Sequence, residues 1–154
     1  MLKHRGNKTD YRKSNRIENT PFKPSAKAKR LAKSILASSD AAERQTLGQK
    51  LFNELSCLLS ISSPQLVIQD KRQSHSLKDG KLARKTYGTY RDGRVTISNK
   101  TAIRQSIVAP KTFMDTLIHE FMHHYDYEGL KLSSSLHTTG FYYRLADVMK
   151  KLVG

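Results

Sequence analysis

Residues 114–129 have the sequence MDTLIHEFMHHYDYEG, which places the pattern His-Glu-x-x-His inside a helix-forming run. Apolar side chains recur every three or four positions along this run, and that period predicts an amphipathic helix. On such a helix His119 and His123 lie one turn apart along the axis and about 40° apart around it. Both imidazoles can therefore reach one metal ion, with Glu120 near enough to hydrogen-bond a water on that metal.

The chemistry that this pattern favours is zinc-dependent hydrolysis. Neutral imidazoles suit zinc, and zinc lowers the pKa of its bound water toward about 7. Glu120 would take a proton as that water attacks a carbonyl carbon and would pass it to the leaving amine. We therefore predict His119 and His123 as metal ligands and Glu120 as the general base. The competing interpretation is a surface helix whose two histidines only face solvent.

A catalytic zinc ion keeps three protein ligands and one open position, so a third ligand is expected. His137 is the predicted one, because it follows His123 by 14 residues, after Gly129 and a serine-rich connection. A reversing loop of that length can bring it back over the metal. Tyr142, Tyr143 and Arg144 come soon afterwards and could approach an oxyanion, but packing into the domain is the favoured interpretation for the two tyrosines.

Three other side chains near the motif are less favoured as metal ligands. His124 is rotated about 100° from His123 and is predicted to face away. Asp126 returns to the face of His119 about 10 Å further along the axis, which fits a supporting contact to His123 or an exposed charge. Glu128 is the weaker alternative for a glutamate-ligated site.

Helical patterns also occur elsewhere in the chain. Helices are predicted from about residue 25 to 39, from 40 to just before 64, from 110 to 129 and from about 139 to 152. Asp40 and Glu43 have capping-box spacing at the start of the second helix. Thr112 and Asp115 have the same spacing at the start of the third, just after Pro110.

The middle of the chain is rich in strand-forming residues. Short strands are predicted at residues 65–69, 86–90 and 95–98, with residues 70–82 as a polar loop. Asp92-Gly93 between the last two strands predicts a type I′ hairpin. The order of elements predicts a single zincin-like α+β domain, with N-terminal helices, a small antiparallel or mixed sheet, a metal-binding helix and a C-terminal helix.

Charge is the strongest signal in the composition. The chain has 28 Lys and Arg against 13 Asp and Glu, a net charge of +15, which predicts an anionic polymer or surface as a partner. Residues 1–25 contain few apolar side chains, so we predict a flexible basic arm that binds nucleic acid. The basic residues of this arm are Lys3, Arg5, Lys8, Arg12, Lys13 and Arg16. Tyr11 lies among them and could stack on a nucleobase. A second basic run comprises Lys71, Arg72, Lys78, Lys81, Arg84, Lys85, Arg91 and Arg94. An acidic membrane surface, ribosomal RNA or mere solvation would fit the same charge.

The only cysteine, Cys57, excludes an internal disulfide and a cysteine-based zinc ribbon, and its leucine neighbours predict burial. No run of about 20 apolar residues is present, so no membrane span is predicted. The N-terminus has no apolar segment typical of a secretory signal. A cytoplasmic location is expected, with a nucleoid-associated or nuclear location as the alternative.

Two segments, 116–124 and 136–144, resemble the SprT-like metallopeptidase family, in which a His, a Gly and an aromatic residue follow the metal helix. Residues 88–98 are similar to the strands that precede that helix in the family. The resemblance extends over about residues 45–153 and assigns residues 26–154 to a SprT-like domain. It implies zinc ligands at His119, His123 and His137.

The same resemblance implies Glu120 as the catalytic base and a peptidase activity. It also suggests a substrate, because the better-known members cut proteins that are crosslinked to DNA. This chain departs from many of them because it has no C-terminal zinc ribbon, which puts that contribution to DNA binding in doubt.

Two hypotheses follow from the sequence. The first is a zinc metallopeptidase that acts on proteins associated with DNA. The second is a nucleic-acid-binding module in which zinc has only a structural role.

Overall fold

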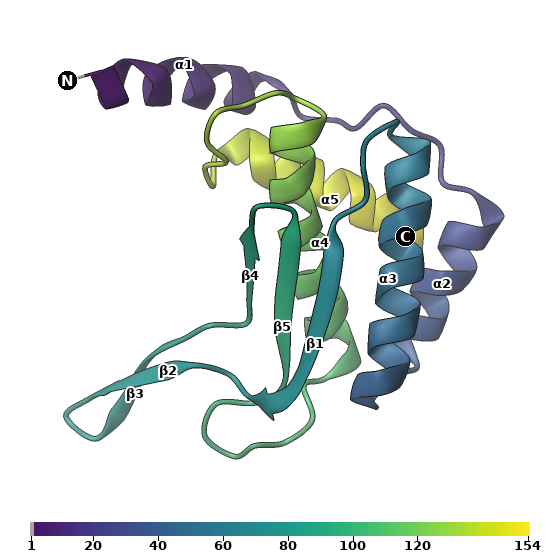
Figure 1. The fold of residues 1–154 in the computed structure, drawn as a ribbon, viewed down its shortest axis with the longest axis vertical. Coiled ribbons are helices and arrows are strands. Elements are labelled where there is room, and N and C mark those ends of the chain that lie inside the picture. Colours follow the sequence, from purple (N-terminus) through teal and green to yellow (C-terminus); the bar gives the residue numbers. More distant parts are fainter. Residues whose placement is uncertain (1) are drawn as a thin grey trace.

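The computed structural model describes residues 2–154, and for residues 2–7 the backbone only. These residues form one α+β domain (Figure 1), as predicted. The helices are α1 (Leu2–Arg16), α2 (Ala26–Leu36), α3 (Ala41–Leu58), α4 (Pro110–Glu128) and α5 (Thr139–Val153). The strands are β1 (Gln65–Arg72), β2 (His75–Lys78), β3 (Lys81–Lys85), β4 (Gly88–Arg91) and β5 (Arg94–Lys100). None of the described helices has the length and apolar character that a membrane crossing needs.

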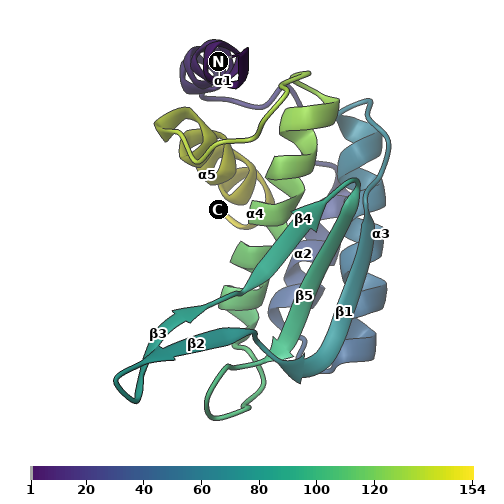
Figure 2. The same cartoon turned by 60° about the vertical axis from the view of Figure 1, so that its left-hand side comes forward.

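A mixed three-stranded sheet in the order β1–β5–β4 forms one layer of the domain. Strand β1 runs parallel to β5, with Leu66 beside Val95, and β4 runs antiparallel to β5. Helices α3 and α4 lie behind the sheet (Figure 2), where α3 contacts β1 and α4 contacts β4 and β5. Val95 and Ile97 are buried on the helix side because successive strand residues face alternate sides.

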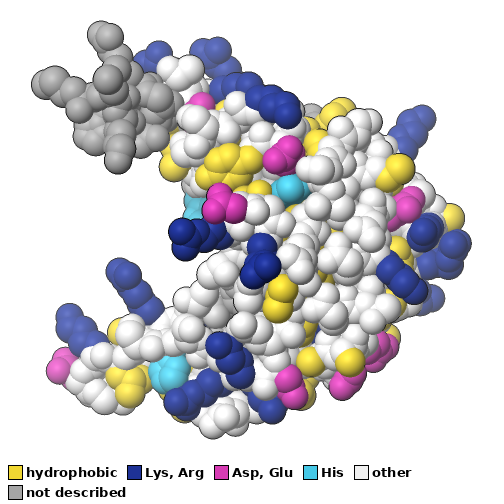
Figure 3. All heavy atoms as spheres, viewed as in Figure 1, with side chains coloured by type: hydrophobic (Ala, Val, Ile, Leu, Met, Phe, Trp, Pro, Cys, Tyr) yellow, Lys and Arg dark blue, Asp and Glu magenta, His cyan; other side chains and the backbone are white. Residues whose placement is uncertain are grey.

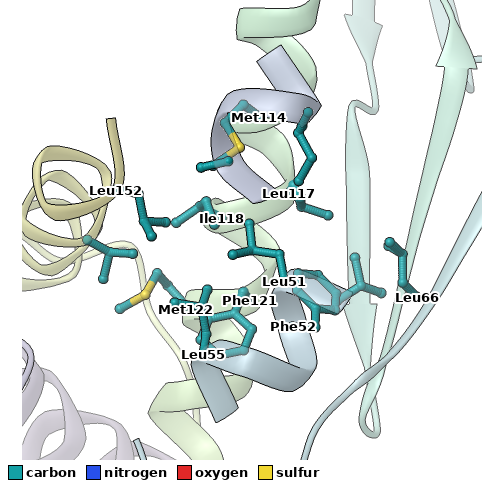
Figure 4. Close-up of a cluster of buried hydrophobic side chains, with 14 of the residues drawn as sticks. Leu51, Phe52, Leu55, Leu66, Met114, Leu117, Ile118, Phe121, Met122 and Leu152 are labelled. Atoms are coloured by element: carbon teal, nitrogen blue, oxygen red, sulfur yellow. The ribbon is translucent and has the colours of Figure 1, made fainter. Parts of the chain in front are cut away.

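The core lies between α3, α4 and this face of the sheet (Figure 4). The rings of Phe52 and Phe121 have centroids 5.4 Å apart, and both side chains are fully buried. Each such side chain stabilises the fold by about 1.5–3 kcal/mol relative to exposure. Gly48 allows α3 to approach β1, because a Cβ there would lie 2.4 Å from the Leu66 side chain.

Local signals set several of the element boundaries. The Asp40 side chain accepts a hydrogen bond from the Glu43 amide at the start of α3, so the predicted cap is confirmed. Asp92 and Gly93 have φ angles of 48° and 79°, as the predicted type I′ turn requires. The capping box predicted at Thr112 is wrong: α4 begins at Pro110 after Ala109, without a side-chain cap.

The predicted loop at residues 70–82 is also wrong. Strand β1 continues to Arg72, and β2 and β3 form a two-stranded antiparallel ribbon that projects from the domain. Asp79 and Gly80 close this ribbon with φ angles of 53° and 73°, so it ends in a second Asp-Gly turn. The flanking residues are polar because most of the ribbon is exposed, and they therefore lack the alternation that indicates a strand.

The N-terminal segment differs from the flexible arm predicted for residues 1–25. Residues 2–16 form α1, which contacts α5, and Phe22 is buried in the core. Hydrogen bonds rather than apolar contacts hold much of this segment, and composition does not reveal such bonds. The side chains of Lys3 and Arg5 lie outside the described residues. Cys57, which was predicted to be buried, is exposed.

Candidate metal centre

Helix α4 has one face in the core and another at a cleft. Met114, Leu117 and Phe121 are fully buried on the core face. His119 and His123 lie on the cleft side and are half-buried. The helical period that was used to predict α4 therefore also separates the packing residues from the candidate ligands.

The third candidate ligand comes from the loop between α4 and α5. The Nε2 atom of His137 lies 3.1 Å from Nε2 of His119 and 3.0 Å from Nε2 of His123. The structure thus brings together the three residues that were predicted to bind a metal, as one group of converging ring nitrogens. His137 is exposed, so the group is accessible from solvent.

The three imidazoles fit a zinc ion. A tetrahedral zinc site with bonds of about 2.0–2.1 Å places neighbouring nitrogens about 3.3 Å apart, close to the separations observed here. Burial, together with the neighbouring histidines, lowers the pKa of His123 to about 4, and burial and His137 lower the pKa of His119. Both rings are therefore neutral at pH 7, which is the form that binds metal.

His123 is oriented by a chain of buried polar contacts. Its Nδ1 lies 2.7 Å from Oγ of Ser135, and Ser135 in turn donates to Oδ2 of Asp126 at 2.7 Å. Arg144 donates to the other oxygen of Asp126 at 3.0 Å, and both of these side chains are fully buried. With the proton on Nδ1, the Nε2 lone pair of His123 points to the other two histidines, which is the usual role of such outer partners.

Asp126 therefore supports His123 through Ser135, and the alternative of an exposed charge is wrong. His124 faces away from the cluster, as predicted, and lies 2.9 Å from the Tyr90 hydroxyl. Glu128 lines a different hollow, beside Tyr90 and His124.

Glu120 lies next to the histidine cluster and is 8% exposed. Burial raises the pKa of its carboxyl group from 4.5 to about 7. Gly88 at the start of β4 passes close to it, since a Cβ on that glycine would lie 3.3 Å from Cγ of Glu120. The close approach of β4 thus shields the carboxyl group from water on that side.

A cleft of about 600 Å³ opens beside the cluster. His119, His137 and Glu120 lie along it, together with Gly88 of β4 and Met149 of α5. In the space-filling view the molecule is hollowed between the β2–β3 ribbon and the rest of the domain, with Lys and Arg side chains on the ribbon (Figure 3).

Tyr142 and Tyr143 do not pack into the domain, contrary to the favoured prediction. They are 49% and 53% exposed. The ring centroid of Tyr142 lies 5.8 Å from that of His137, so its side chain borders the histidine cluster.

Neither Ser135 nor the contact between Arg144 and Asp126 was predicted. Arg144 was considered as a group that could approach an oxyanion, but its side chain is fully buried and donates to Asp126. Ser135 belongs to a run of three serines that indicates only a connection. Arg144 lies three residues after Phe141 on a face that α5 buries, and a buried arginine on an apolar face is a signal for a paired acid.

No family model, curated protein or solved structure matches this chain. The resemblance to the SprT-like family therefore stays a prediction, and it rests mainly on the two segments 116–124 and 136–144. What the site can do follows from its geometry and chemistry.

Proposed function

We propose that this protein is a zinc metallopeptidase in which His119, His123 and His137 bind the metal and Glu120 is the general base. The supporting observation is the convergence of three ring nitrogens, 3.0 and 3.1 Å apart, beside a buried carboxyl group. Three protein ligands with access to a cleft are typical of catalytic rather than structural zinc.

A zinc ion at this position would polarise a substrate carbonyl group and activate a water molecule. Glu120 would accept a proton from that water and return it to the nitrogen of the departing peptide. Without a metal, burial raises the pKa of Glu120 to about 7, and the charge of a bound zinc ion would lower that pKa and favour the carboxylate that accepts the proton. Asp126 and Ser135 would hold the His123 ring in the orientation that keeps Nε2 available.

The cleft fits an extended peptide. Strand β4 is at the edge of the sheet, and its first residue, Gly88, lines the cleft beside Glu120. An edge strand can bond an added strand through main-chain groups, which binds peptides with little demand on their sequence.

Metal content and proteolysis test the proposal together. The wild-type protein should bind one zinc ion, His137→Ala should lose it, and His75→Ala, a histidine outside the cluster, should retain it. Glu120→Gln should retain zinc but cleave a casein substrate about 100-fold to 10,000-fold more slowly, since a general base contributes about that much. Cleavage by Glu120→Gln at the wild-type rate would contradict the mechanism.

We further propose that the enzyme belongs to the SprT-like family and acts on proteins associated with DNA. The support is the charge of the β2–β3 ribbon, where Lys78, Lys81 and Arg84 are all exposed. Lys85 at the end of β3 and Tyr87 just after it line the same cleft as Glu120, so a polyanion on the ribbon would lie near the active site. Proteolysis should increase when DNA is added, and DNA affinity should fall steeply with salt. Salt-insensitive DNA affinity would contradict this part of the proposal.

The alternative is a nucleic-acid-binding module with a structural zinc site. The exposed Lys and Arg side chains of the β2–β3 ribbon support nucleic-acid binding equally well. A structural site, however, has four protein ligands and is closed, whereas His119 and His137 line an open cleft. A fourth protein ligand on the bound metal, together with no difference between wild type and Glu120→Gln, would favour this alternative.

A further inference from the structure

The loop between α4 and α5 has little regular structure, yet it carries two groups of the metal centre. Ser135 supports His123, and His137 is a candidate ligand. The backbone amides of Ser133 and Ser134 donate to a side chain of α1 rather than to another part of the loop. The position of His137 therefore depends on contacts from outside the loop.

Asp10 of α1 provides these contacts. Its Oδ2 atom accepts from the amides of Ser133 and Ser134 at 3.0 Å each. The same oxygen also accepts from both serine hydroxyl groups. Burial opposes the charge of Asp10, but the hydrogen bonds from the two serines outweigh it and lower its pKa, which keeps the carboxylate ionised.

Two more residues of α1, Lys13 and Ser14, hold the two ends of the loop. Lys13 Nζ donates to the carbonyl oxygen of Leu130 at 2.5 Å, before His137 in the chain. After His137, the hydroxyl groups of Ser14 and Thr138 lie 2.9 Å apart. The contacts thus lie on both sides of the candidate ligand.

The start of α5 is pressed closely against α1. The Gly140 amide donates to Oδ1 of Asn15 at 3.1 Å. A Cβ on Gly140 would lie only 2.2 Å from the carbonyl oxygen of Ser14 and 2.8 Å from Cα of Asn15. A backbone contact this close admits no side chain, so Gly140 is needed for α1 to dock.

A buried arginine connects α1 to the second histidine. Arg144 donates to the carbonyl oxygens of Ser14 and Ile17 at 2.5 and 2.6 Å. It also donates to Asp126, which supports His123 through Ser135. Helix α1 therefore contacts the surroundings of His137 directly and those of His123 through one guanidinium group.

We infer that α1 is a structural part of the metal centre, and that Asp10 is a positioning residue that holds the His137 loop for metal binding. This inference rests on the proposed zinc site but not on peptidase activity. It assigns to the N-terminal segment a role that its basic composition does not suggest. Residues that position metal ligands usually change metal affinity about 10- to 100-fold when they are removed.

The test compares Asp10→Asn with Asp79→Asn, which makes the same charge change at the exposed ribbon turn. Zinc affinity is measured by competition with a chromogenic chelator, and the visible spectrum of the cobalt-substituted protein reports the ligand geometry. Asp10→Asn should bind zinc about 10- to 100-fold more weakly and change the cobalt spectrum, with the circular dichroism of the fold retained. Asp79→Asn should match the wild type. Wild-type affinity and an unchanged cobalt spectrum in Asp10→Asn would overturn the inference.

Gly140→Ala provides an independent variant, because it removes the docking of α1 without altering a polar side chain. It should weaken zinc binding in the same direction as Asp10→Asn, and wild-type affinity in Gly140→Ala would count against the inference. If the wild-type protein takes up no zinc, the proposed function fails and the metal-binding role of Asp10 fails with it, and amide hydrogen exchange at Ser133 and Ser134 then tests separately whether Asp10 positions the loop. Faster exchange in Asp10→Asn than in Asp79→Asn would support it, and equal exchange would overturn it.

Discussion

The buried carboxyl group of Glu120 should make the stability of the metal-free protein depend on pH. Burial raises its pKa from 4.5 to about 7, so the folded chain holds the proton more tightly than the unfolded chain. Below pH 4.5 the group is protonated in both states, and the favourable effect on folding is complete. As the pH rises through 7 this contribution is lost, because the folded state must then bury a charge.

The substitution Glu120→Gln isolates this effect. Glutamine has the shape of the protonated acid but does not ionise, so the variant avoids the cost at high pH. At 1.36 kcal/mol per pKa unit, a rise from 4.5 to about 7 corresponds to about 3 kcal/mol. Because Glu120 is only 8% exposed, solvent screening reduces this value little.

Urea denaturation at pH 5 and pH 8, with a chelator present and circular dichroism as the signal, measures the difference. Glu120→Gln should be more stable than the wild type by about 3 kcal/mol at pH 8, and by less than about 1 kcal/mol at pH 5. Glu18→Gln, on the exposed linker after α1, serves as the control and should show no such change with pH. A difference between Glu120→Gln and wild type that is the same at both pH values would refute the reasoning.

Three further substitutions have expected outcomes. Phe52→Ala should lower the free energy of unfolding by about 3–5 kcal/mol in urea denaturation, because it empties a fully buried site against Phe121. Arg144→Met should destabilise the fold by about 3–5 kcal/mol in the same assay, because Asp126 stays buried without its counter-charge, and the loss should shrink when Asp126→Asn is added. Ser135→Ala should bind zinc about 10- to 100-fold more weakly in chelator competition, whereas Ser76→Ala on the exposed ribbon should bind like the wild type.

Elements with strong local signals were predicted well. The start of α3 at Asp40 and the turn at Asp92-Gly93 depend on residues within a few positions of each other, so their spacing alone indicates them. The β2–β3 ribbon was missed although it has the same Asp-Gly turn. It has no buried face, and without one the alternation that identifies a strand is absent.

In the candidate site, too, features that follow from helix spacing were predicted, whereas features that depend on the path of a loop were not. The spacing of His119 and His123 follows from the helical repeat, and so does the rotation of His124 away from them. The role of Asp126 could not be decided in the same way. Its contact with His123 passes through Ser135, whose place depends on the path of the loop.

The amino-acid sequence by itself determined the α+β class, the His-Glu-x-x-His spacing on α4 and the excess of positive charge, because helix periodicity and composition are local or additive properties. Only the tertiary structure decided that the nitrogens of His137 and the two helical histidines converge, and that Glu120 is buried enough to raise its pKa to about 7. It also decided that residues 2–16 form a helix held against the loop between α4 and α5. The contacts of Asp10 with Ser133 and Ser134 join residues more than 120 positions apart, and no local pattern records a hydrogen bond over such a separation.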